Sequence, residues 1–205
     1  MAARYTRSVS IDDRFDELAA ALTGFHRTWT VHLGIELGWL AALRGAGAGG
    51  MTPVELAAAT QTDPTLLQDW LRAANASELL SFDGQRAVGD PDVATVLLDE
   101  GRPEYLGGQF VATVVASMDW EALTEVFRTG VPVRSRPDRY RRSIERLTVQ
   151  DIAVFFVEVL GIMPGLTARL ATPGARAVDV HCGGGRWLVA MARRFPALEL
   201  LGVRD

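Results

Sequence analysis

The chain has 205 residues, 48% of them hydrophobic, and 25 acidic against 21 basic residues leave a formal net charge of −4. A chain of this length and composition is globular, buries a core and holds more than one folding unit, while its charge disfavours broad attraction to nucleic acid or anionic membranes. The one cysteine, Cys182, excludes an internal disulfide, and no signal peptide or run of about 20 apolar residues is visible, so we expect a cytoplasmic protein.

The N-terminal part is predicted to be helical. Asp12 and Asp13 open an amphipathic helix with apolar residues at helical spacing. Gly24 is expected to interrupt it, after which a second helical stretch covers 25–43. The glycine-rich run at 45–50 ends this stretch.

Two short helices and a hairpin follow. Thr52-Pro53 and Asp63-Pro64 each place an N-cap residue before a proline at the first helical position. An Asp-Gly turn then joins two short strands within residues 79–88. Two helices followed by a two-stranded hairpin predict a winged helix.

Winged helices in transcription regulators read DNA with basic residues on the exposed face of the second helix. Here that helix offers Arg72, with Asp69 one turn before it. Because Asp69 lies next to Arg72 on the helix and the net charge is negative, a DNA-binding regulator is the least favoured of the functional hypotheses.

A helical connector is predicted between the hairpin and the C-terminal segment. Its helices are expected at 90–98, 103–128, 138–161 and 163–170, with a loop at 131–137. The arginine-rich run at 134–142 is the strongest local positive charge. We interpret it as a solvated helix start; a phosphate-bearing partner is the alternative.

The C-terminal segment contains the most informative pattern, AVDVHCGGGR at 177–186. It is an apolar run that ends at an acid, followed by a glycine cluster and a helix. Glycines between a strand and a helix let the backbone approach a ligand at the helix N-terminus. A second strand follows and has an acid near its end, about 20 residues past the glycines, where such folds hold a ribose. The pattern predicts a nucleotide-type site.

This stretch resembles the first motif of class I S-adenosylmethionine (SAM)-dependent methyltransferases, an acid followed by Gly-x-Gly-x-Gly. Asp179 stands at the acid, Gly183 and Gly185 at the second and third glycines, and His181 where the first glycine belongs. The candidate cofactor-binding residues are Asp179, His181, Gly183, Gly185 and Asp205. No catalytic residue is assigned.

The resemblance extends over about 25–205. The segments TPVELAAATQTDPTLLQDWLRAANASELL and DEGRPEYLGGQF are similar to the N-terminal region of bacterial small-molecule methyltransferases. The implied fold is mainly α, with a winged-helix dimerisation domain at 1–100, a helical connector at 101–172 and the first β-α-β unit of a Rossmann-like SAM-binding domain at 173–205. The connector of that family also lines the acceptor pocket. Tyr105, Phe110, Met118 and Trp120 are therefore candidates for that pocket, or else plain core.

Two departures from the motif affect the predicted SAM site. His181 projects a side chain into the site or moves the loop, and Arg204 stands where the family often has the ribose-binding acid. We interpret the site as degenerate, with SAM bound weakly or lost; alternatively, His181 stacks or hydrogen-bonds in a working site. Cys182 is interpreted as a packing residue. His26 and His32 lie six apart on a helix without other metal ligands nearby, so no metal site is predicted.

Three functions remain open from the sequence. The first is a SAM-dependent methyltransferase with a small-molecule acceptor, present as an N-terminal portion and inactive alone, because only two strands of the family's seven-stranded sheet are expected before Asp205. The second is a non-catalytic, methyltransferase-like dimerisation or partner-binding protein, and the third is the DNA-binding regulator. We expect a homodimer, buried through 25–43, or a partner chain that completes the sheet.

Overall fold

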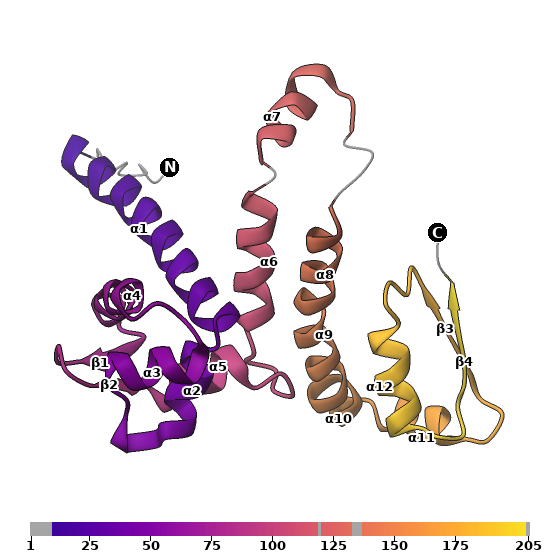
Figure 1. Ribbon diagram of the computed structural model, residues 1–205. Helices are drawn as coiled ribbons and strands as arrows, with labels where there is room; N and C mark the ends of the chain where they lie inside the picture. Colours follow the sequence, from indigo (N-terminus) through magenta and orange to yellow (C-terminus); the bar gives the residue numbers. More distant parts are fainter. Residues whose placement is uncertain (1–9, 119, 133–136, 204–205) are drawn as a thin grey trace, which may run out of the picture.

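The computed structural model describes residues 10–118, 120–132 and 137–203, and its arrangement is shown in Figure 1. The long helix α1 (Ile11–Glu36) begins at a capping box, in which Asp13 N donates to Ser10 Oγ at 3.0 Å and Ser10 N to the Asp13 carboxylate at 2.9 Å. The predicted interruption at Gly24 is wrong, because one glycine costs a helix only about 1 kcal/mol relative to alanine. The break falls at Gly38, whose φ of 73° is left-handed and non-helical.

The next four elements follow the predicted local signals. Helix α2 (Trp39–Ala46) runs into the short 3-10 helix η1 (Gly47–Gly49), and the glycine-rich run ends the stretch as predicted. In helix α3 (Pro53–Thr60), Glu55 N donates to Thr52 Oγ1 at 3.2 Å and Thr52 N to Glu55 Oε2 at 2.7 Å. Helix α4 (Pro64–Ala76) is capped by Asp63, whose Oδ1 accepts from two backbone N–H groups at 2.9 Å.

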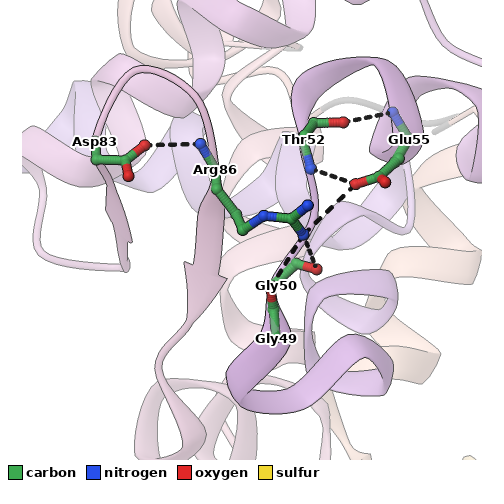
Figure 2. A network of polar contacts seen from close by, with 6 residues as sticks. All are labelled: Gly49, Gly50, Thr52, Glu55, Asp83 and Arg86. Atoms are coloured by element: carbon green, nitrogen blue, oxygen red, sulfur yellow. Dashed lines mark hydrogen bonds and ion pairs between the residues drawn. The ribbon is translucent and has the colours of Figure 1, made fainter.

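The predicted hairpin is formed by β1 (Leu80–Phe82) and β2 (Ala87–Gly89), which pair antiparallel. Figure 2 shows how Arg86 ties this hairpin to the start of α3. Its guanidinium donates to the carbonyl oxygens of Gly49 and Gly50, each at 3.0 Å, and lies 3.6 Å from the Glu55 carboxylate. In α4, Arg72 pairs with Asp69 at 2.8 Å. Both arginines thus form ion pairs within the chain.

One apolar core holds the N-terminal helices and the hairpin together. The rings of Trp39 and Trp70 pack with centroids 4.7 Å apart, and Trp70 Nε1 donates to the Thr30 carbonyl oxygen at 2.9 Å. The buried residues of this core come from α1 to α5 (Pro91–Leu98), the loop before β1 and the hairpin, and are Val31, Trp39, Leu40, Leu43, Leu56, Ala57, Leu67, Trp70, Leu71, Ala74, Leu79, Leu80, Ala87 and Leu97. Most of the apolar residues in the second half of 25–43 are therefore used inside the chain.

The connector is helical, as predicted, but its divisions differ. Its elements are α6 (Gly107–Ser117), α7 (Trp120–Thr129), α8 (Asp138–Leu147), α9 (Val149–Val154), the π-helical η2 (Phe155–Val159), α10 (Leu160–Ile162) and α11 (Pro164–Ala171). The single helix predicted at 103–128 is wrong. Leu106 N donates to the Val96 carbonyl oxygen at 2.8 Å, which holds the chain against α5, so the helix begins only at Gly107.

Part of the arginine-rich run, 134–136, lies outside the described residues, as does most of the predicted loop. The run's described end starts α8, where Arg141 forms an ion pair with Asp138. This agrees with a solvated helix start. Among the described helices none is by itself long and apolar enough to cross a membrane, and one bent pair, 138–162 with 164–171, meets the length and composition limits together.

Helices α6 and α8 pack side by side in Figure 1, and α1 packs against α6. Gly108 makes the close approach of α6 to α8, since a Cβ there would lie 2.0 Å from the Arg146 carbonyl oxygen. The Arg146 side chain forms an ion pair with Glu36 of α1. His32 is buried nearby, and its Nδ1 has no hydrogen-bond partner among the described residues. Burial lowers the pKa of this imidazole, Glu36 opposing and Arg146 adding to the shift.

The C-terminal residues form the predicted β-α-β unit. Strands β3 (Arg176–Val180) and β4 (Glu199–Val203) are parallel, with Asp179 opposite Gly202. Helix α12 (Arg186–Arg194) covers one face, where Met191 and Phe195 are buried and Trp187 lies 5.6 Å from Phe155 of η2 between ring centroids. The other face is bare, because its apolar side chains are exposed; these are Val178, Val180, Leu201 and Val203.

Candidate cofactor site

The loop between β3 and α12 adopts the backbone conformation that its glycines allow. His181, Gly183 and Gly185 have φ values of 63°, 52° and 77°, all left-handed. Glycine takes this conformation without strain, whereas a side-chain-bearing residue is disfavoured by about 1–2 kcal/mol. Residue 181, at the first glycine of the motif, therefore has the left-handed backbone conformation that favours glycine. His181 adopts this conformation under strain.

Two backbone hydrogen bonds hold the loop against the sheet. Cys182 N donates to the Val203 carbonyl oxygen at 3.1 Å, and Gly185 N donates to the Cys182 carbonyl oxygen at 2.7 Å. The Cys182 sulfur lies 2.9 Å from where a Cβ on Gly202 would be. Cys182 therefore packs the loop onto β4, in agreement with its interpretation as a packing residue.

An open cleft of about 440 Å³ lies between this loop and the connector. Its size is within the usual range for small-molecule sites. The residues that line it come from α8, α9, β3, the loop and the start of α12, and are Glu145, Thr148, Asp151, Ile152, Val178, Asp179, His181, Cys182, Gly183, Gly184, Arg186 and Trp187. The cleft therefore sits at the carboxyl end of β3, where ligands bind in open α/β sheets.

The structure brings together three of the five predicted cofactor-binding residues. Asp179, His181 and Gly183 line the cleft, with Asp179 half-buried and the other two exposed. Gly185 lies beside them as the N-cap residue of α12. Asp205 lies outside the described residues, as does Arg204, so the predictions about the ribose position stay predictions.

No described side chain caps the first turn of α12. Its N-cap residue is a glycine, and the structure shows no side-chain hydrogen bond to this helix end. The first backbone N–H groups of a helix have no partner within it and carry a partial positive charge. This end therefore suits an anionic ligand group such as a carboxylate.

The sequence analysis did not predict that residues of α8 and α9 line one side of the cleft. Glu145, Thr148 and Asp151 recur at a spacing of three on the connector, and all three line the cleft. That spacing places polar residues near one face of a helix. It could have indicated a polar surface on the connector. The sequence offered no indication that this face meets a loop more than 30 residues later.

Of the four acceptor-pocket candidates, the three whose side chains the structure describes do not line this cleft. Tyr105 is 2% exposed, and burial raises the pKa of its phenol. Phe110 packs against the N-terminal core, and Met118 is exposed. The side chain of Trp120 lies outside what the structure describes. Tyr105 thus acts as a core residue, whereas Phe110 packs against the core and also lines a separate open cleft of about 510 Å³ next to α1 and α5. Elsewhere in the described chain, no three His, Cys, Asp or Glu side chains converge as metal ligands.

The sequence matches no protein-family model and no curated protein, whereas the fold matches solved methyltransferases. The mitomycin 7-O-methyltransferase superposes with a TM-score of 0.62 at 20% identity, over 94% of this chain and 58% of that chain. Human N-acetylserotonin methyltransferase, solved in complex with SAM, gives 0.59 at 13% identity, over 96% and 60%. A putative O-methyltransferase from Nostoc punctiforme gives 0.58 at 15% identity, over 91% and 55%.

These likenesses define the class of fold: a mainly α region followed by a Rossmann-like β-α-β unit, as in class I SAM-dependent methyltransferases of the small-molecule type. The predicted fold class and family resemblance are thereby confirmed at the level of the fold. The chain spans about 55–60% of the length of the solved methyltransferases it matches.

Proposed function

We propose that this chain is a portion of a SAM-dependent methyltransferase with a small-molecule acceptor, and that its SAM site is degenerate. The observation that carries the proposal is the cleft at the carboxyl end of β3, closed on one side by a left-handed glycine loop and the uncapped start of α12. This geometry suits the methionyl end of SAM, whose carboxylate would meet the first N–H groups of α12. The solved relatives support the same assignment through their fold.

SAM, when bound, would supply an electrophilic methyl group on its sulfonium. The described residues would contribute binding and orientation: the loop backbone would allow close approach, and Asp179 and the α12 terminus would flank the methionyl end. Methyl transfer depends mainly on bringing an acceptor in line with the methyl group. Within residues 137–203, the sheet that would position the rest of SAM and the acceptor consists of β3 and β4.

The 205-residue chain tested alone is therefore expected to show no methyl transfer. The purified chain is incubated with SAM labelled in its methyl group and a panel of phenols, amines and carboxylic acids. The solved mitomycin 7-O-methyltransferase serves as the positive control for the assay. Turnover of any acceptor above the protein-free background would contradict the proposed inactivity, and would assign the activity to this chain.

The second candidate, a dimerisation or partner-binding protein, is favoured by an exposed apolar stripe on α1. Ile11, Phe15, Leu18 and Leu22 alternate at spacings of four and three and are 66–85% exposed. This is the spacing of a coiled-coil seam, which is stable only against another helix. We therefore propose that α1 pairs with α1 of a second copy, through a stripe N-terminal to the 25–43 segment that sequence reasoning favoured.

Light scattering of the wild-type chain at micromolar concentration is expected to give the mass of a dimer. The double substitution Leu18→Glu with Leu22→Glu places charges in the seam and is expected to weaken association at least about tenfold. Ala20→Glu adds a charge to an exposed residue outside the stripe and serves as the matched control. A monomeric wild type, or an equal loss in the control, would exclude pairing through this stripe.

A further inference from the structure

Glu145 of α8 lies directly against the glycine loop. A Cβ on Gly184 would lie 2.6 Å from Glu145 Oε1 and 2.9 Å from its Cδ, so the carboxylate contacts the loop backbone where a larger residue would stand. The same side chain lines the cleft that Asp179 and His181 line from the opposite element. Residues from the connector and from the β-α-β unit therefore form one site.

The Glu145 carboxylate has no hydrogen bond or ion pair with any described residue, although the residue is half-buried. On the same helix Asp138 pairs with Arg141 and Arg146 pairs with Glu36, whereas Arg142, three residues before Glu145, forms no ion pair with a described residue. A carboxylate partly removed from water is unfavourable unless a cation or hydrogen-bond donors compensate it. The cleft in front of it, which Arg186 also lines, is where a cationic ligand group would bind.

Gly184 supports this arrangement from the loop side. In the Gly-x-Gly-x-Gly pattern, residue 184 stands at a variable position between Gly183 and Gly185, and this chain has a third glycine there. A side chain at 184 would displace the carboxylate, since even a Cβ would approach it to 2.6 Å. Glycine at 184 and Glu145 thus fit each other, and together they leave the carboxylate at the loop end of the cleft.

We propose that Glu145 binds the α-ammonium group of the methionyl end of SAM, an inference that rests on the proposed function. The ammonium group carries three donors and a full positive charge, and a carboxylate is its strongest acceptor in proteins. The loop end of the cleft is also where the proposed function places the methionyl end. Glu145 would therefore distinguish SAM and its demethylated product from nucleosides that lack the amino-acid head.

The test compares three ligands on the wild-type chain and on Glu145→Gln, which keeps the size of the side chain and removes its charge. S-adenosylhomocysteine keeps the amino-acid head but lacks the sulfonium charge, and 5′-methylthioadenosine lacks both. Ligand-observed NMR titration at millimolar ligand measures even weak dissociation constants. We expect Glu145→Gln to weaken SAM and S-adenosylhomocysteine by about tenfold or more and to leave 5′-methylthioadenosine unchanged. Glu158→Gln, which neutralises an exposed carboxylate of η2 that does not line the cleft, is the matched control.

Each outcome decides the assignment. Equal affinity of the wild type and Glu145→Gln for S-adenosylhomocysteine would overturn the role of Glu145 and leave the proposed function intact. An equal loss with Glu158→Gln, or a loss that extends to 5′-methylthioadenosine, would also overturn it, because either result indicates an effect that is not specific to the Glu145 carboxylate. If the wild type binds none of the three ligands, the proposed SAM site itself fails, and the role of Glu145 fails with it.

Discussion

Gly108→Ala is expected to lower the free energy of unfolding by about 3 kcal/mol. The added Cβ would lie 2.0 Å from the Arg146 carbonyl oxygen and 2.7 Å from its carbonyl carbon. These are backbone atoms of α8, so the contact is relieved only by separating α6 from α8. That separation would also disturb the Arg146 ion pair with Glu36 and move Glu145 at the cleft.

Denaturant unfolding followed by circular dichroism measures this effect, with Gly24→Ala as the matched control. Gly24 lies within α1, and a Cβ there would meet nothing within 4 Å. Its replacement is expected to raise stability by about 0.5–1 kcal/mol, because alanine is the better helix former. If Gly108→Ala is as stable as the wild type, the two connector helices do not approach as closely as described.

His181→Gly combined with Arg204→Asp is expected to tighten SAM binding about 100-fold relative to a wild type that binds above ~100 μM. The first substitution removes a side chain from the cleft and relieves the left-handed strain of residue 181. The second substitution, Arg204→Asp, is argued from the sequence pattern, because residue 204 lies outside the described residues. It restores a carboxylate that accepts hydrogen bonds from ribose hydroxyls, a charge-assisted interaction of about 1.5–3 kcal/mol.

Calorimetric titration of SAM into the wild type, the double variant and an Arg169→Asp control measures the gain. Arg169 is exposed on α11 and does not line the cleft, so the control makes the same change of charge elsewhere. Micromolar binding by the wild type would show that the substituted motif still works. Wild-type binding that is weak and equal to that of the double variant would exclude His181 and Arg204 as the cause.

Features set by neighbouring residues were predictable from the sequence. The caps at Thr52 and Asp63 and the β-α-β unit around the glycine motif depend on side chains and backbone a few residues apart, and all are present in the structure. The position of the helix break was not predictable in the same way. Gly24 and Gly38 are both glycines in an apolar helical pattern, and packing of Trp39 and Leu40 into the core accompanies the turn at Gly38.

Composition and local pattern by themselves determined the mainly α fold class, the glycine loop and three of the residues that line its cleft. The tertiary structure alone decided that Glu145 is the opposite wall, that Gly108 sets the spacing of α6 and α8, and that the exposed apolar stripe lies at the start of α1. The physical reason is that hydrogen-bonded turns and caps depend on neighbours within a few residues. Which helix face meets which loop depends instead on the simultaneous packing of segments far apart in the chain, and periodicity does not specify that choice.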